Sequence, residues 1–117
     1  MRKDLLARYM ANKRCTLLGV GPVSRNCVDA AIGLANRHHI PIMLIASRRQ
    51  IECGALGGGY VEKWSTEAFV DYVKSRDKAG HITLARDHGG PWQHPSEGKM
   101  SLAAAMQSAR DSYTVDI

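Results

Sequence analysis

The sequence predicts an α/β fold built on a parallel sheet. Along the 117 residues, three short apolar segments alternate with amphipathic segments. Each apolar segment runs into polar or Gly-containing residues, and residues that can cap a helix follow. Strands that alternate with helices pair in parallel and are joined by right-handed crossovers. We therefore expect three consecutive βα units, preceded by one N-terminal helix.

The leading helix and the first βα unit occupy the first third of the chain. Residues 4–13 carry apolar side chains at helical spacing. The apolar run 15–20 ends at Gly21, which predicts a buried strand followed by a loop. Asn26 is expected to cap a helix that runs to about Arg37. The inward stripe of that helix is predicted to be Val28, Ala31, Ile32 and Ala35.

The second βα unit begins with the continuous apolar run 40–46, typical of a parallel sheet covered on both faces. A long polar loop is expected over 47–64. Ser65 then has the position of an N-cap, and Trp64 and Phe69 have the spacing of a hydrophobic staple. The helix is predicted to end near residue 76 and to face inward with Phe69, Tyr72 and Val73.

The third unit starts with a predicted strand over 81–86 and a loop over 87–99. Ser101 is expected to cap an Ala-rich helix. Its apolar face is predicted to consist of Leu102, Ala105, Met106 and Ala109.

Composition narrows the class of protein. The net charge is +5, but the basic residues are spread along the chain, and no Lys/Arg run interleaves with aromatic residues. Three cysteines without CxxC spacing favour reduced thiols. No apolar run is long enough to cross a bilayer, and no signal-peptide pattern opens the chain. We expect a cytoplasmic protein without a nucleic-acid or membrane partner.

The pair Asp87-His88 follows the third predicted strand. Loops after the carboxyl ends of parallel strands gather on one face of a sheet and carry the chemistry. Histidine is the commonest metal ligand, and aspartate can move protons. Zinc normally needs three protein ligands, and His94 is the only nearby second nitrogen. A turn capped by Asp87 beside a surface histidine is the alternative.

Two further segments carry candidate groups. Arg48 and Arg49, after the second strand, have side chains that pair with phosphate or carboxylate. Gly58 and Gly59 lie in a Gly-rich stretch whose backbone amides could approach a phosphate, although the stretch matches no phosphate-loop motif. A solvated charge pair and a surface loop are the respective alternatives.

These segments, in this order, resemble a known family. The matching letters are 44–47 with Gln50, then 58–60, 66–69, and the Asp-His-Gly-Gly-Pro-Trp-Gln stretch 87–93. They are similar to the non-catalytic subunit family of class II D-tagatose-1,6-bisphosphate aldolase. The resemblance implies a TIM (β/α)8 barrel, of which this chain would form the N-terminal part. Residues 1–117 would then be one partial domain, with the leading helix in 1–14 and three βα units in 15–117.

The resemblance also implies site residues. His88 would take the position of a Zn²⁺ ligand, and Asp87 that of the carboxylate that transfers a proton. The expected substrate-binding residues are Ser47, Arg48, Arg49, Gln50, Gly58 and Gly59. The apolar letters Ile45-Ala46 stand where such a family would place an acidic residue. The resemblance therefore does not specify which sugar is bound.

Three functions follow as expectations. The first is a metal-dependent sugar-bisphosphate aldolase-like protein of carbohydrate metabolism, as catalytic or accessory subunit. The others are a non-enzymatic assembly subunit and a metal-dependent sugar epimerase. Expected partners are a phosphorylated sugar, a catalytic aldolase subunit, and the remaining barrel segment or another subunit, because a full barrel needs about 250 residues. The rival fold is a three-layer α/β sandwich complete at this length.

Overall fold

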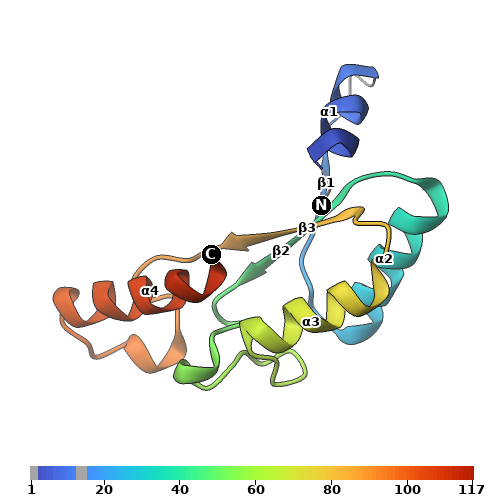
Figure 1. Cartoon of the computed structure of the whole chain (residues 1–117). Helices are drawn as coiled ribbons and strands as arrows, with labels where there is room; N and C mark the ends of the chain where they lie inside the picture. Colours follow the sequence, from blue (N-terminus) through green and yellow to red (C-terminus); the bar gives the residue numbers. More distant parts are fainter. Residues whose placement is uncertain (1–2, 13–15) are drawn as a thin grey trace.

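The computed structural model describes residues 3–12 and 16–117. It has an α/β fold with three parallel strands in one sheet (Figure 1). The elements in order are α1 (Lys3–Asn12), β1 (Leu18–Val20), α2 (Arg25–His38), β2 (Ile42–Ser47), the 3-10 turn η1 (Gly54–Leu56), α3 (Thr66–Arg76), β3 (Ile82–Asp87), the 3-10 turn η2 (Pro95–Glu97) and α4 (Leu102–Asp116).

The strands lie in sequence order, β1-β2-β3, and both pairs are parallel. Leu18 lies opposite Ile42, and Ile42 opposite Ile82. The pairing of β2 with β3 continues to Ser47 and Asp87. The parallel sheet predicted from the alternation of apolar and amphipathic segments is confirmed, and all three strands run toward the same edge of the sheet.

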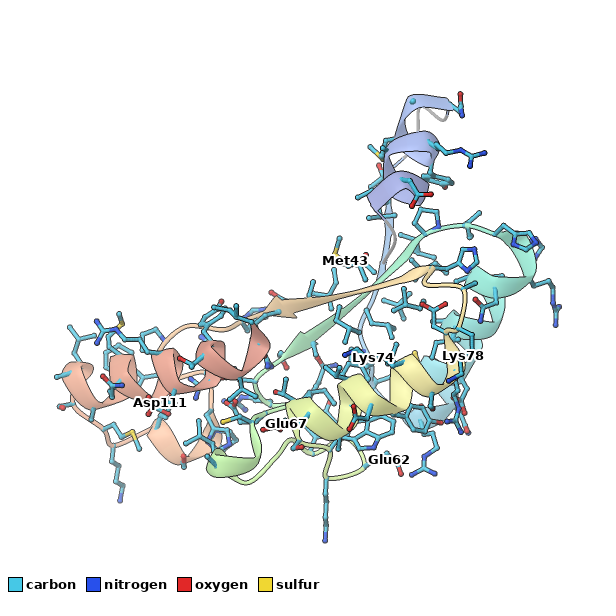
Figure 2. The ribbon with its side chains drawn as sticks, viewed as in Figure 1. Met43, Glu62, Glu67, Lys74, Lys78 and Asp111 are labelled. Atoms are coloured by element: carbon cyan, nitrogen blue, oxygen red, sulfur yellow. The ribbon has the colours of Figure 1, made fainter. Side chains whose placement is uncertain are left out.

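Helices cover only one face of this sheet. Figure 1 shows α2 and α3 on the same side of the strands and α4 beyond their carboxyl ends. The core between sheet and helices is built around Val28, Ile42, Leu44 and Phe69. Met43 lies on the side of the sheet away from α3 and is half-buried (Figure 2). The expectation of a sheet covered on both faces is wrong for the described residues.

Serine residues cap the helices. The side chains of Ser65 and Ser101 accept from the third backbone N–H of α3 and α4, as predicted. The Trp64 and Phe69 rings lie 5.4 Å apart, which confirms the staple. For α2 the predicted cap, Asn26, is wrong by two positions, because the side chain of Ser24 accepts from the backbone of Cys27.

The strand boundaries shift by one or two residues. Ile40 follows His39, the C-cap of α2, and its N–H donates to the Ala35 carbonyl of that helix, so β2 begins at Ile42. β3 extends to Asp87, because the ladder with β2 continues to that residue. β1 is shorter than predicted, and Cys15 lies outside the described residues.

The stretch between β2 and α3 is a packed segment. Ile51, Cys53, Val61 and Trp64 are buried in it. Burial also raises the pKa of the Cys53 thiol, as expected for a passive core cysteine. The prediction of a polar loop over 47–64 is wrong for these four positions, because apolar residues spaced along the loop turn back into the core.

The buried face of α4 agrees with the predicted one at Ala105 and Ala109 and differs from it at the other positions. It consists of small residues, Ala105, Ser108, Ala109 and Ser112. Leu102 is 59 % exposed, and Met106 is half-buried. The apolar pattern missed the other two positions of this face because they are serines, whose hydroxyls hydrogen-bond to buried charged groups.

The leading helix α1 stands apart from the other helices in Figure 1. Among the described helices, α1 included, none combines the length and the apolar character that crossing a bilayer demands.

Candidate active site

Ser47 and Asp87 end two neighbouring strands on the open face of the sheet. They are directly paired in the register of β2 and β3, so their backbones lie about 4.8 Å apart. Side chains alternate along a strand, and the residues of β2 on the helix side are Ile42, Leu44 and Ala46. Ser47 therefore belongs to the opposite face, together with Asp87. The structure brings these two predicted site residues together.

His88 follows Asp87 with a positive φ of 44°. That conformation is uncommon for a residue other than glycine. The backbone N–H of His88 donates to Asp87 Oδ1 over 2.8 Å, and its Nε2 lies 3.5 Å from Asp87 Oδ2. The side chains are 64 % exposed for His88 and 57 % for Asp87. The two groups form an accessible carboxylate–imidazole pair at the carboxyl end of β3.

Zinc coordination requires more donors than this pair supplies. Within residues 3–12 and 16–117, no group of three or more His, Cys, Asp or Glu side chains is placed to hold a metal ion. The second predicted nitrogen, His94, is engaged with Ser96: its Nδ1 lies 2.7 Å from Ser96 Oγ. The described residues do not fit Zn²⁺ by themselves, because a zinc site takes at least three protein ligands.

Gln50 connects the ends of β1 and β2. Its Oε1 accepts from the Ser47 backbone N–H over 2.9 Å. Its Nε2 lies close to Gly21, 3.5 Å from the point that a Cβ on Gly21 would occupy. Gln50 thus holds the backbone of Ser47 and lies against the first loop, beside the candidate site.

Gly58 and Gly59 are placed by packing. A Cβ on Gly59 would lie 2.0 Å from the Gln50 carbonyl oxygen, and Gly58 has a φ of 73°. The Gly58 N–H donates to the Cys53 carbonyl, and the Gly59 N–H donates to the Trp64 carbonyl. Both amides are already occupied within the segment, so this geometry does not favour their predicted contact with a phosphate.

Arg48 lies inside the protein, with 0 % of its surface exposed. Its Nε donates to Glu52 over 2.6 Å, and its Nη2 to Glu97 over 2.7 Å. The remaining bonds go to the Gly90 carbonyl and to the Ser108 hydroxyl. Burial acts to lower the pKa of Arg48, but the hydrogen bonds and charges of the two glutamates outweigh burial and raise it. This position does not favour the predicted contact of Arg48 with substrate.

Arg49, the next residue, is exposed. Its Nε donates to the Gln93 carbonyl over 3.3 Å, which brings the guanidinium to the loop that follows β3. In the described part of the chain, Arg49 forms no ion pair. Of the two predicted arginines, Arg49 is the one that can meet an anionic ligand.

Glu52 and Glu97 are two residues that the sequence analysis missed. Both are fully buried and both bond to Arg48. Arg48 and Glu52 are opposite charges four positions apart, but this spacing indicates a pair on a helix, and a loop is expected here. Glu97 had no such signal, since its partner lies 49 positions away.

The loop after β3 is also held by hydrogen bonds between its own residues. Trp92 Nε1 donates to the Met100 carbonyl over 3.2 Å, and Trp92 is 44 % exposed. Pro95 opens η2, with His94 as its N-cap. These contacts fold the loop back on itself before α4 begins.

Comparison with protein-family models finds no match, and the curated proteins contain none either. A solved structure described as a probable tagatose 6 phosphate kinase from Sinorhizobium meliloti is similar, with a TM-score of 0.66. The identity is 22 %, and the similarity covers 86 % of this chain. This chain spans 26 % of the length of that protein. The similarity shows that the α/β fold of the described residues also occurs in an experimental structure.

Proposed function

We propose that the chain supplies the first three βα units of a TIM barrel that acts on a phosphorylated sugar. The single observation that carries the proposal is the register pairing of Ser47 with Asp87. It sets two polar side chains side by side at the carboxyl edge of a parallel sheet, where barrel enzymes hold their catalytic groups.

Three features support the barrel. The strands are parallel and in sequence order, helices cover one face, and the other face is open. In a barrel that open face becomes the packed interior, filled by side chains from alternate strands. The remaining units would come from a longer polypeptide or from another chain, and the neighbour of known structure is about four times as long as its matched part.

The proposed reaction class is aldol cleavage of a ketose bisphosphate, as the resemblance implies. In this reading Asp87 exchanges a proton with a substrate hydroxyl, and Ser47 hydrogen-bonds to the substrate. Arg49 pairs with a phosphate through its free guanidinium edge. The neighbour's description names a tagatose phosphate, which supports the same class of sugar for a different reaction.

His88 is proposed as one ligand of a Zn²⁺ site whose other ligands lie outside this chain. The described residues supply too few donors, and we derive no step through the metal. We expect the 117-residue chain alone to bind Zn²⁺ weakly and the completed barrel to bind it stoichiometrically. His88→Ala should abolish that binding.

The test compares Asp87→Asn with Asp71→Asn in the chain together with the segments that complete its sheet. Asp71 is an exposed carboxylate of α3, remote in sequence from the site loops. Tagatose 1,6-bisphosphate and fructose 1,6-bisphosphate serve as substrates for cleavage. Asp87→Asn should lower kcat by about 10²–10⁴, the usual worth of a general acid–base, while Asp71→Asn leaves it unchanged. Equal activity of the two variants contradicts the assignment.

A non-enzymatic assembly subunit is the second candidate, favoured by the incomplete donor set around His88. An assembly subunit would leave partner activity unchanged after His88→Ala but lose the complex after a charge is placed at Met43 on the open face. Phosphorylation of tagatose 6-phosphate by ATP is assayed in parallel, because a kinase reaction would replace both proposals.

A further inference from the structure

The two loops that carry the candidate site are joined through one buried arginine. Arg48 stands at the start of the segment after β2 and donates to the Gly90 carbonyl over 3.1 Å and to Glu97 over 2.7 Å. Both acceptors belong to the segment between β3 and α4. Gly90 lies only two residues after His88, so Arg48 holds the backbone next to the candidate pair.

The same guanidinium is fixed from its other sides. Glu52 accepts from its Nε over 2.6 Å, and the Ser108 hydroxyl accepts from Nη2 over 3.1 Å. Glu52 in turn accepts hydrogen bonds from the Cys53 backbone and from Ser112 of α4. Arg48 therefore has little freedom to move, because every element around it supplies a partner.

Few other polar contacts join these two loops. In the part of the chain that the structure describes, the hydrogen bonds from residues 48–64 to residues 88–99 are made by Arg48 and Arg49. The Arg49 contact is exposed and long, at 3.3 Å. The Arg48 contacts are shorter and shielded from water, where charge-assisted hydrogen bonds are strongest.

We propose that Arg48 is a positioning residue, which sets the Asp87-His88 pair against Ser47 by locking the two loops together. The role of that pair in a reaction rests on the proposed function, whereas the locking is a property of the chain itself. Arg48 touches no substrate. It acts through Gly90 and Glu97 on the backbone conformation of His88, whose φ of 44° has to be held by the surrounding contacts.

The planar guanidinium is required for this role. It reaches four acceptors from three nitrogens, in a fixed fork that spans both loops. A lysine keeps the charge but has one nitrogen with three donors, which cannot reach Glu52, Gly90 and Glu97 together. Arg48→Lys consequently separates the geometry of the contact from its charge.

The experiment measures amide hydrogen exchange in the 117-residue chain and in two variants. Arg48→Lys is compared with Arg49→Lys, its neighbour, which also contacts the second loop. Arg48→Lys should raise exchange over both 50–64 and 88–99 by about tenfold, because the loops then open without unfolding the sheet. Arg49→Lys should change exchange less than about twofold. An equal response of the two variants, or a response in only one loop, overturns the proposal.

A spectroscopic readout follows the site directly. The intraresidue distance between the amide and α protons of His88 reports its φ, because a positive φ brings these two protons closer than a negative φ does. Arg48→Lys should weaken the nuclear Overhauser effect between them toward that of an averaged loop residue, whereas Arg49→Lys should leave it in place. An effect that stays unchanged in Arg48→Lys contradicts the positioning role even if the loops exchange faster.

A milder variant covers the case in which Arg48→Lys does not fold. Glu97→Gln keeps an acceptor for Arg48 but removes the charge that strengthens the bond. It should raise exchange over 88–99 and leave 50–64 unchanged, because Glu52 still holds Arg48 from the other side. Protection of 88–99 equal to that of the unsubstituted chain overturns the proposal.

Activity separates this proposal from the proposed function. In the completed barrel, Arg48→Lys should lower kcat about tenfold with little change in KM, because ground-state contacts are retained. If Asp87→Asn abolishes turnover but Arg48→Lys changes neither kcat nor exchange, the positioning role falls and the proposed function stands. If exchange responds as expected but no sugar phosphate is cleaved, the positioning role stands and the proposed function falls.

Discussion

The strands end in different polar side chains on the two faces of the sheet. On the face covered by helices, β2 runs Ile42, Leu44 and Ala46 into the buried Arg48. Likewise, β3 ends on this face with Arg86, which pairs with Asp116 at the end of α4. On the open face the same strands end in Ser47 and Asp87.

The difference shows what each polar residue can do. The arginines of the covered face meet carboxylates of their own chain and fasten the segment before α4 and the end of α4 to the sheet. The polar groups of the open face keep exposed edges for a ligand. One position along the strand decides whether a polar side chain meets carboxylates of its own chain or lies on the open face, because successive side chains point to opposite faces. Substitutions on the two faces test this division.

Removing the buried guanidinium is expected to cost the most. Arg48→Met leaves Glu52 and Glu97 buried without their common cation, which should lower the free energy of unfolding by about 3–5 kcal/mol. Urea unfolding followed by circular dichroism measures the change. Arg49→Met is the matched control and should stay within about 0.5 kcal/mol, since its side chain is exposed. A similar loss in both variants would remove the distinction between the two arginines.

A core substitution on each face gives the next comparison. Leu44 is fully buried, and Leu44→Ala should lower the free energy of unfolding by about 2–5 kcal/mol. Ile45 is only half-buried in this chain, so Ile45→Ala should cost clearly less. Completion of a barrel would bury Ile45, and the cost of Ile45→Ala should then rise toward that of Leu44→Ala. Equal costs in the isolated chain argue that its open face is already covered in solution.

Low pH should lower the free energy of unfolding through protonation of Glu97, which bonds to Arg48 on the helix-covered face of the sheet. Burial opposes ionisation of Glu97, but hydrogen bonds from Ser108 and Arg48 and the charge of Arg48 outweigh it, so its pKa is lowered. The folded state then binds this proton less readily than the unfolded chain, so stability rises with pH in this range. The contribution is present above the ordinary carboxyl pKa and is lost as the pH falls through the lowered value.

Stability measured between pH 7 and pH 3 checks this expectation, with Glu97→Gln as the variant. Glu97→Gln should flatten the acid limb of the profile. The control is Glu67→Gln: the pKa of the exposed Glu67 is lowered by hydrogen bonds from its own amide and Ser65. Its effect should be smaller because water screens the group. An acid limb that Glu97→Gln leaves unaltered contradicts the assigned cause.

The smallest effects on stability belong to the open face. Ser47→Ala and Asp87→Asn should each change the free energy of unfolding by no more than about 0.5 kcal/mol, because neither side chain is enclosed. Asp87→Asn retains an oxygen to accept the His88 amide bond. A loss above 1–2 kcal/mol, on the order expected for a lost buried hydrogen bond, would assign Asp87 to the scaffold instead of the site.

The alternation of apolar and amphipathic segments was sufficient to predict the parallel sheet, and the positions of Ser65 and Ser101 before the predicted helices were sufficient to predict two caps. Boundaries depended on single hydrogen bonds, such as that of Ile40 to the end of α2, which no periodicity reveals. The pairing of Ser47 with Asp87 follows from parallel strands ending together, so it could be anticipated. The burial of Arg48 could have been read from the period of two that links it to Ala46.

The pairing of Arg48 with Glu97 and the two buried serines of α4 could not be predicted. Glu97 meets Arg48 across 49 positions, and the serines of α4 are buried only because they hydrogen-bond to this cluster. Polar residues at such positions resemble surface residues in a sequence. Their burial depends on charges supplied by other segments, which a local pattern does not contain.

The two tryptophans report on separate parts of this chain. Trp64 is buried against Phe69 and Tyr72, so its fluorescence emission should lie toward the blue and follow the helical layer. Trp92 is partly exposed in the segment after β3, so its emission should lie toward the red and respond to quenchers. Trp64→Phe leaves Trp92 as a single optical probe beside the candidate site. That variant times the opening of the loop alone, and Trp92→Phe, which leaves Trp64, times the loss of the core.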